Sequence, residues 1–291
     1  MNWTFKKVSL PLSITLSLIL VLFPEYQPAF GLASNPLKII FPYQWIGNID
    51  QSNFEEPSGI IFHPGLGTLF VVGDDGDIGE FTTKGKLLRQ KRISEADFEG
   101  ITVNPATKLL YLAVEGDEKI IEIEPRDLTV QREFVIDRVF QGRTILKKGG
   151  QGIEAITFIP NPKHPEGGTF FLSNQSFKYN NSEDPSVIIE VSVPLRSTAR
   201  TGKNGPFIAR ILRTFNINVI DISGMHYDNL RALIYFISDA TNTFFSMMTN
   251  GKIINSYAFP GDDQEGITVD DQGFLYFVQD SGGLIKLRWH R

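Results

Sequence analysis

Cysteine is absent from this chain of 291 residues, and its absence excludes disulfide bonds, thiolate metal sites and a lipid anchor attached through cysteine. Histidine is scarce, with four residues. The chain lacks a basic stripe and has a formal net charge of −5, which disfavours nucleic acid as a partner. The phosphate-binding motifs G-x-G-x-x-G and G-x-x-x-x-G-K-[ST] are missing. So is the G-x-S-x-G motif of many serine hydrolases, so that class of enzyme is also disfavoured.

The first 33 residues have the pattern of a secretory signal peptide. Lys6 and Lys7 precede an apolar run over residues 8–23, and small residues end the segment before a cleavage site after Ala33. The run contains Pro11 and is short for a spanning helix, so an uncleaved membrane anchor is the alternative. The sequence therefore predicts an extracytoplasmic protein, periplasmic or secreted, that touches a membrane only if this segment remains attached.

One sequence pattern recurs five times, and it predicts a β-hairpin each time. An acidic residue or serine precedes Gly or Ala, then a short apolar strand, a turn and a second apolar strand that ends on a polar residue. The copies lie at residues 56–74, 94–117, 152–174, 221–239 and 263–281. Further strand-like runs follow each copy. Each unit therefore has about four strands in roughly 40–50 residues, which is the size of a β-propeller blade.

These repeats predict an all-β protein, a single β-propeller over residues 37–291. Five four-stranded blades fit best, and six is the alternative. The expected blades are residues 56–94, 97–137, 152–217, 221–260 and 263–291. The fifth lacks its outermost strand, whereas residues 37–50 offer an unpaired one. We expect that N-terminal strand to complete the C-terminal blade, because closure removes exposed sheet edges.

Two polar positions recur in every hairpin. The position before Gly or Ala is occupied by Ser58, Glu99, Glu154, Ser223 and Glu265. The position closing the second strand is occupied by Asp74, Glu115, Asn174, Asp239 and Asp280. Both positions lie at the same end of a hairpin, so we expect them to be cross-strand neighbours. In a propeller, all five pairs would then surround one mouth of the central channel.

So many acids in one place require solvation, bound protons or a cation. Carboxylate and amide oxygens without His or Cys suit a hard ion, and Ca²⁺ is the expected cofactor. The predicted metal ligands are Glu99, Glu154 and Glu265, followed by Asn174, Asp239 and Asp280. The alternative to metal binding for the closing positions is a structural role in turn formation, because Asp and Asn after a strand are ordinary turn residues.

Two long connections, residues 139–152 and 175–186, are expected beside the acidic mouth. The residues predicted to bind a polar or anionic ligand there are Arg143, Lys147, Lys148, Lys178 and Tyr179. A solvated loop with dispersed charge is the alternative. His226 takes the place of a threonine found in three of the other units, and we interpret it as a hydrogen-bonded core residue, or alternatively as a catalytic base. The repeated glycines indicate close packing of strands near the axis.

Taken together, segments such as FEGITVNPATKLLYLAVEGD and QEGITVDDQGFLYFVQD resemble the SdiA-regulated (YjiK-like) family of exported β-propeller proteins. The resemblance implies a propeller behind an N-terminal signal or anchor, with calcium at the channel, and it implies no particular activity. Two hypotheses remain. The first is a monomeric calcium-binding propeller that binds a small polar or anionic ligand or a protein partner. The second is a calcium-dependent hydrolase of esters, lactones or phosphoesters, similar to gluconolactonase and paraoxonase propellers.

Overall fold

The computed structural model describes residues 38–39, 44–49, 54–147, 152–179, 186–196, 205–259 and 261–290. The chain divides into two units, Met1–Phe30 and Gly31–Arg291, and all the described residues belong to the second. Every regular element among them is a β-strand, and none of them forms a helix that could span a membrane. The predicted signal peptide, residues 1–33, lies outside the described residues.

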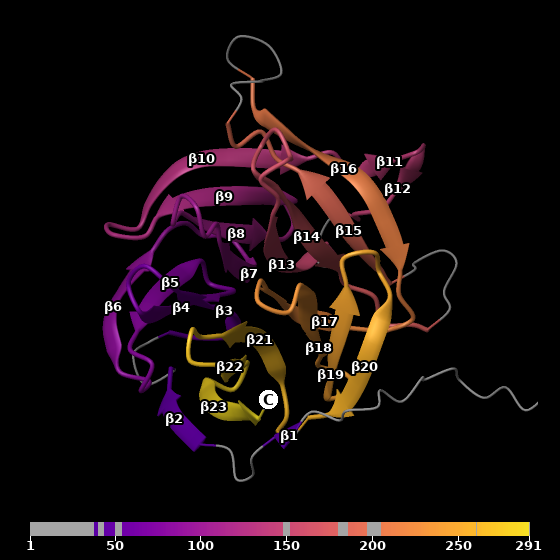
Figure 1. Cartoon of the computed structure of the whole chain (residues 1–291). Helices are drawn as coiled ribbons and strands as arrows, with labels where there is room; N and C mark the ends of the chain where they lie inside the picture. Colours follow the sequence, from indigo (N-terminus) through magenta and orange to yellow (C-terminus); the bar gives the residue numbers. More distant parts are fainter. Residues whose placement is uncertain are drawn as a thin grey trace, which may run out of the picture. The chain divides into compact units, whose positions relative to one another are not determined.

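Four blades consist of consecutive antiparallel strands (Figure 1). The first contains β3 (Pro57–His63), β4 (Thr68–Gly73), β5 (Asp77–Phe81) and β6 (Leu87–Arg92). The second contains β7 (Phe98–Val103), β8 (Leu110–Val114), β9 (Lys119–Glu124) and β10 (Thr129–Ile136). The third contains β13 (Ile153–Pro160), β14 (Gly168–Asn174), β15 (Val187–Ser192) and β16 (Phe207–Asn216). The fourth contains β17 (Ile222–Asp228), β18 (Leu233–Ser238), β19 (Thr243–Met248) and β20 (Ile253–Ala258).

The remaining blade combines the two ends of the described chain. Its strands β21 (Gln264–Val269), β22 (Phe274–Gln279) and β23 (Gly283–His290) are consecutive, and β2 (Gln44–Asn48) pairs antiparallel with β23. The short strand β1 (Lys38–Ile39) also pairs with β23. The predicted closure of the ring by the N-terminal strand is confirmed, and with it the all-β propeller fold.

The inner strands surround the axis in chain order, and threonine side chains link them. A threonine hydroxyl in one inner strand accepts a hydrogen bond from a backbone amide of the next strand at three places. The bonds run from Phe158 N to Thr102 Oγ1 (3.0 Å), from Tyr227 N to Thr157 Oγ1 (2.8 Å) and from Phe62 N to Thr268 Oγ1 (3.0 Å). These bonds explain why threonine recurs in the repeat.

Apolar side chains fill the space between neighbouring blades. Five buried clusters are present among the described residues, one between each adjacent pair of blades around the ring. The cluster between the first and second blades, for example, packs Phe70 and Val72 against Phe98 and Leu112. The strands are apolar on both faces because each blade packs against two neighbours, which holds the inner strands rigidly at the axis.

The second and third blades are joined at their outer edges, which the sequence did not predict. Strand β10 pairs in parallel with β16, from Phe134 opposite Phe207 to Ile136 opposite Ala209. The two blades therefore form one continuous sheet of eight strands. A small hairpin, β11 (Val139–Phe140) and β12 (Arg143–Thr144), follows β10 in the chain (Figure 1).

Candidate metal centre at the channel mouth

Each inner strand contains one unpaired residue near its start, and the recurring polar residue occupies that place. In the second blade Phe98 pairs with Val114 and Gly100 pairs with Ala113, so Glu99 lies in a β-bulge. The same shift of register leaves four further residues unpaired: Ser58, Glu154, Ser223 and Glu265. A bulge redirects the extra side chain and is common beside functional sites. Five bulges at equivalent positions therefore redirect five polar side chains near one end of the ring.

The backbone amide of the residue that closes the second strand donates a hydrogen bond to the carbonyl oxygen of the residue two positions before the bulge. In the second blade, the Glu115 amide donates to the Asp97 carbonyl oxygen at 3.0 Å. The equivalent bonds in the other blades join Asp74 to Glu56, Gln175 to Gly152, Asp239 to Asp221 and Asp280 to Asp263. Glu99 and Glu115 therefore lie at the same end of the hairpin without being directly opposed, because the bulge shifts the register.

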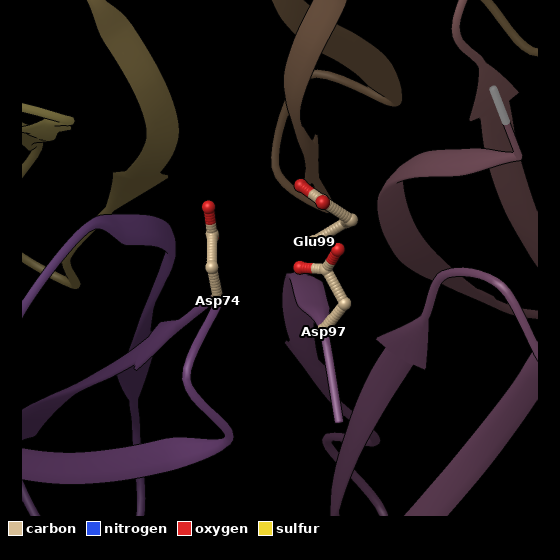
Figure 2. Close-up of side chains that lie close together, drawn as sticks. All are labelled: Asp74, Asp97 and Glu99. Carbon is tan, nitrogen blue, oxygen red and sulfur yellow. The ribbon is translucent and has the colours of Figure 1, made fainter. Parts of the chain in front are cut away.

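Three carboxylates from the first two blades come together at this end. One oxygen each of Asp74, Asp97 and Glu99 lies within 4.8 Å of the other two. Asp97 and Glu99 lie next to each other, and Asp74 faces them from the neighbouring blade (Figure 2). The Oδ1 atom of Asp97 is buried and has no hydrogen-bond partner among the described residues. An orphaned acceptor beside two further carboxylates is a donor set suited to a cation.

The pKa values of this cluster are all raised. Burial, followed by the negative charges of Asp97, Glu56 and Asp280, raises the pKa of Asp74 to about 7. Burial also raises the pKa of Glu99 well above its usual range, and the charge of Glu154 adds most to that effect. The pKa of Asp97 is likewise raised by burial, although a hydrogen bond with Glu99 lowers it. Without a cation, the cluster therefore retains protons that isolated carboxylic acids would lose.

The other two inner glutamates belong to the same electrostatic ring. Burial raises the pKa of Glu154 well above its usual range, reinforced by the charges of Glu115 and Glu265. Burial also raises the pKa of Glu265 well above its usual range, and the negative charge of Asp239 adds most to this effect. The structure thus places all three predicted inner glutamates around the axis, whereas only Glu99 belongs to the tight cluster of three carboxylates.

A second group of acids lies where the third blade begins. The Glu115 carboxylate accepts a hydrogen bond from the Gly152 amide at 2.7 Å. Glu118 is fully buried, and burial raises its pKa to about 7 even though Arg138 opposes the shift. The Arg138 guanidinium lies 3.6 Å from Glu118 Oε1 and donates to the carbonyl oxygens of Gly116 and Lys147. Arg138 therefore ties the loop after β12 to the acidic end of the second blade.

Asn174 lies one residue out of the alignment that the sequence suggested. It pairs with Ile153 and so corresponds to Ser238 and Gln279, whereas Gln175 makes the equivalent closing bond. The Asn174 Oδ1 atom accepts a hydrogen bond from the Val187 amide at 2.7 Å, within the same blade. The longer turn of the third hairpin hid this offset in the sequence.

The closing acids of the last two blades have different environments. Asp239 accepts a hydrogen bond from the Gln264 amide at 2.9 Å, and burial raises its pKa. Asp280 is exposed to solvent. Asp239 thus links the fourth blade to the fifth, whereas Asp280 lies at the solvent side of the ring.

Serine replaces glutamate in two blades and there bonds to the next blade. Ser58 donates to the Phe98 carbonyl oxygen, and Ser223 donates to the Gln264 carbonyl oxygen at 2.5 Å. Each acceptor directly precedes a bulged glutamate. The short serines therefore hold the backbone from which Glu99 and Glu265 project.

The loop residues predicted to bind a ligand are only partly described. Arg143, Lys178 and Tyr179 are exposed, Lys147 is half-buried, and Lys148 lies outside the described residues. At this end of the ring, Arg138, which the sequence did not single out, forms an ion pair with the buried Glu118.

A narrow waist separates the acidic mouth from the other end of the channel. In four blades the bulged residue is followed directly by a glycine: Gly59, Gly100, Gly224 and Gly266. In the third blade Ala155 occupies this position. A Cβ atom on Gly266 would lie 2.7 Å from the Ile60 nitrogen, and one on Gly59 would lie 2.8 Å from the Gly100 Cα atom. The predicted close packing of glycines is confirmed. A cavity of about 10 Å³ remains at the waist, lined in part by Glu99 and Glu265, which is room for about one water molecule.

His226 lies beyond the waist, at the end of the channel opposite the acids. It lines a cavity there, and its Nδ1 atom lies 3.3 Å from Thr268 Oγ1. The interpretation as a hydrogen-bonded residue is confirmed. A hydrolase working at the acidic mouth would therefore need a base other than His226.

The raised pKa values predict that the metal-free protein loses stability as the pH rises. The folded state retains protons on Asp74, Glu99, Glu154 and Glu265 that the unfolded chain has already released, so each step up in pH favours unfolding. His226, whose pKa burial lowers to about 4, has the opposite effect only below about pH 6.5. We therefore expect the melting temperature in chelator to fall between about pH 6.5 and 8. A melting temperature that rises over this interval would contradict the protonation of the ring.

The sequence missed Asp97, Glu118 and Arg138, and it assigned Asp74 no metal role. A signal for Asp97 was present, because an acid precedes the bulge by two residues in four of the five units, at Glu56, Asp97, Asp221 and Asp263. Glu118 and Arg138 gave no such signal, since they lie on connections that differ between blades.

A family model described as SdiA-regulated matches residues 46–282. Among solved structures, the glutaminyl cyclase of Myxococcus xanthus is similar, with a TM-score of 0.56 and 12% identity over 87% of this chain and 96% of that chain. The Cps50 (Swd1) β-propeller domain of Myceliophteria thermophila has a TM-score of 0.45 and 10% identity over 87% of this chain and 99% of that domain. No curated protein matches the sequence significantly. At 12% identity, the similarity to the glutaminyl cyclase shows a common fold alone.

Proposed function

This chain belongs to the SdiA-regulated family, and from that premise we propose that it is an exported calcium-binding propeller whose acidic mouth binds a ligand or partner. The metal joins the first and second blades through Asp74, Asp97 and Glu99. Glu154 and Glu265 complete the negative ring around it.

One observation carries the proposal: three carboxylates converge within 4.8 Å, and the buried Asp97 Oδ1 atom has no hydrogen-bond partner among the described residues. Burying such a group without a partner costs about 1–3 kcal/mol, and more when it is charged. A bound cation removes this cost and the repulsion between the carboxylates. Turn formation alone gives no reason for Asp97 and Glu99 to face each other.

Calcium suits these donors better than a transition metal. The cluster offers carboxylate oxygens, and the chain contains no cysteine. Ca²⁺ accepts six to eight oxygen ligands in flexible geometry, and water or a ligand oxygen can supply those that the protein does not. An ion with such open positions can hold a polar or anionic molecule at the mouth. The exposed side chains of Arg143 and Lys178 are the candidates to contact that molecule.

Direct calcium binding tests this function. Isothermal titration of the chelator-treated full chain is expected to show saturable binding of Ca²⁺. The Glu99→Gln variant keeps the size of the side chain and removes one charged ligand, so we expect it to weaken binding about tenfold or more. Asp97→Asn is expected to act in the same direction.

The matched control is Glu95→Gln, which changes the same chemical group on an exposed residue nearby. Its affinity for Ca²⁺ is expected to equal that of the unmodified protein. Absence of saturable binding, or equal affinities of Glu99→Gln and Glu95→Gln, would refute the proposed site.

A further inference from the structure

A second cavity, of about 520 Å³, opens at the end of the channel opposite the acidic mouth. All five blades contribute to its wall, through the ends of their inner strands and the turns that follow. Representative lining residues, one from each blade, are Phe62, Thr102, Phe158, His226 and Val269. The volume falls within the range of about 300–1,000 Å³ that is typical of small-molecule sites.

This cavity is separate from the proposed metal centre. The glycine waist lies between the two, because the glycines follow the bulges in each inner strand and precede the lining residues. A Cβ atom at Gly266 or Gly59 would already clash with the neighbouring backbone, so the waist does not admit a ligand of this size. Occupation of one end therefore does not require occupation of the other.

The wall of the cavity is mainly apolar, and two of its three carboxylates, those of Asp228 and Asp270, have hydrogen-bond partners, whereas Asp271 is exposed to solvent. Pro64, Pro105 and Pro160 lie in the lining, together with Leu230, which is 72% exposed. Asp228 accepts hydrogen bonds from the Arg231 guanidinium and from the Tyr235 hydroxyl at 3.0 Å.

Asp270 is satisfied in a similar way. Its carboxylate accepts hydrogen bonds from the Tyr276 hydroxyl at 2.8 Å and from the amides of Gln272 and Phe274 at 2.9 and 2.8 Å. Neither of these two acids therefore needs a cationic ligand, and the apolar wall offers an anion no counter-charge.

His226 provides a hydrogen-bond donor in this apolar wall. Phe62 N donates to Thr268 Oγ1, and the same hydroxyl lies 3.3 Å from His226 Nδ1. When the hydroxyl donates its hydrogen to Nδ1, the proton of the neutral ring lies on Nε2, which is then the donor for a ligand. Burial lowers the pKa of His226 to about 4, so the ring is neutral at physiological pH.

We propose that this cavity binds a small, uncharged, largely apolar molecule whose hydrogen-bond acceptor is bound by His226 Nε2. Apolar contacts with the five blades provide most of the affinity, and His226 orients the molecule. Leu230 covers part of the opening.

Acetophenone is a suitable probe, because it combines an aromatic ring with one carbonyl acceptor. The full chain, labelled with ¹³C at the histidine rings, is titrated with acetophenone and followed by NMR. We expect the His226 resonance, assigned from the His226→Phe variant, to shift saturably while those of His63 and His164 do not. Benzoate and benzylamine carry the same ring with a negative and a positive charge, and both are expected to bind more weakly.

Two variants locate the binding site by ligand-observed NMR. His226→Phe keeps an aromatic ring and removes the donor, so we expect it to weaken acetophenone binding about three- to tenfold, which corresponds to one hydrogen bond. Leu230→Glu places a charge at the opening on an exposed residue, so it leaves the fold intact and is expected to weaken binding at least as much. Leu88→Glu, at a leucine that is 49% exposed on β6, is the matched control and is expected to bind normally.

The outcomes separate the alternatives. No saturable shift, or binding by both His226→Phe and Leu230→Glu with the affinity of the unmodified protein, would refute the site. Tighter binding of benzylamine than of acetophenone would show a cation site and refute the proposed class of ligand. Chelator and Glu99→Gln are expected to leave acetophenone binding unchanged, so this result stands or falls separately from the calcium proposal.

Discussion

Calcium at a thousand times its dissociation constant is expected to raise the free energy of unfolding by about 4 kcal/mol. The ion binds the folded ring, where carboxylates from two blades converge, and the unfolded chain offers no such arrangement. A stabilisation of this size is a large share of the 5–15 kcal/mol that is typical of a folded protein. Thermal unfolding with and without chelator at about pH 7.5 measures it.

Replacing Glu99, Glu154 and Glu265 together by glutamine separates two effects of opposite sign. The variant is expected to lose the stabilisation by calcium, because the ring no longer attracts the ion. In chelator, however, it is expected to melt at a higher temperature than the unmodified protein at about pH 8. There the substitutions remove buried like charges whose pKa values burial and mutual repulsion raise.

A control variant changes net charge equally without touching the ring, through Glu95→Gln, Glu133→Gln and Asp271→Asn, all at exposed positions. It is expected to respond to calcium as the unmodified protein does. If the glutamine variant of the ring keeps the full response to calcium, the acidic mouth is not where the ion binds.

Gly266→Val is expected to prevent stable folding. Its Cβ atom would lie 2.7 Å from the Ile60 nitrogen and 3.0 Å from the Gly59 carbonyl carbon, both of which belong to the backbone of the next blade. A flexible side chain could move aside, but here a whole blade would have to shift. Overpacking of this kind typically costs 1–3 kcal/mol, and we expect more than about 3 kcal/mol because the ring is closed. Chemical denaturation, or loss of soluble protein, reports the effect.

The matched comparison places alanine at two glycines of the waist, Gly100 and Gly266. A Cβ atom at Gly100 meets its nearest neighbour, the Ile156 nitrogen, at 3.1 Å rather than 2.7 Å. Gly100→Ala is therefore expected to be less destabilising than Gly266→Ala, and the third blade already has Ala155 at this place. Equal unfolding midpoints for the two alanine variants would contradict close contact at the waist as the cause.

The fold was predictable because the repeat specifies it five times. Each hairpin combines apolar strands with a turn, and the missing fourth strand of the last unit required a partner, which β2 supplies through Trp45 opposite Ile285. The position of the inner glutamates was predictable for the same reason, since equivalent residues of a repeat occupy equivalent places. The close packing at the glycines that follow them was also predictable, because a small residue that recurs within a strand allows backbones to approach closely.

Other features could not be inferred, because they depend on register and on contacts between blades. A single unpaired residue shifted Glu99 away from Glu115, and a longer turn moved Asn174 one place out of alignment. The convergence of Asp74 with Asp97 joins different blades, so no pattern within one unit reveals it. The pairing of β10 with β16 likewise depends on the long third blade.

The closure of the last blade also constrains the order in which this protein can be completed. A ribosome makes β2 before every other described strand except β1, yet β2 pairs with β23, which comes last among the described strands. The blade that joins them therefore cannot be complete before β23 has been made. Closure of the ring, which the convergence of the carboxylates requires, waits for that strand.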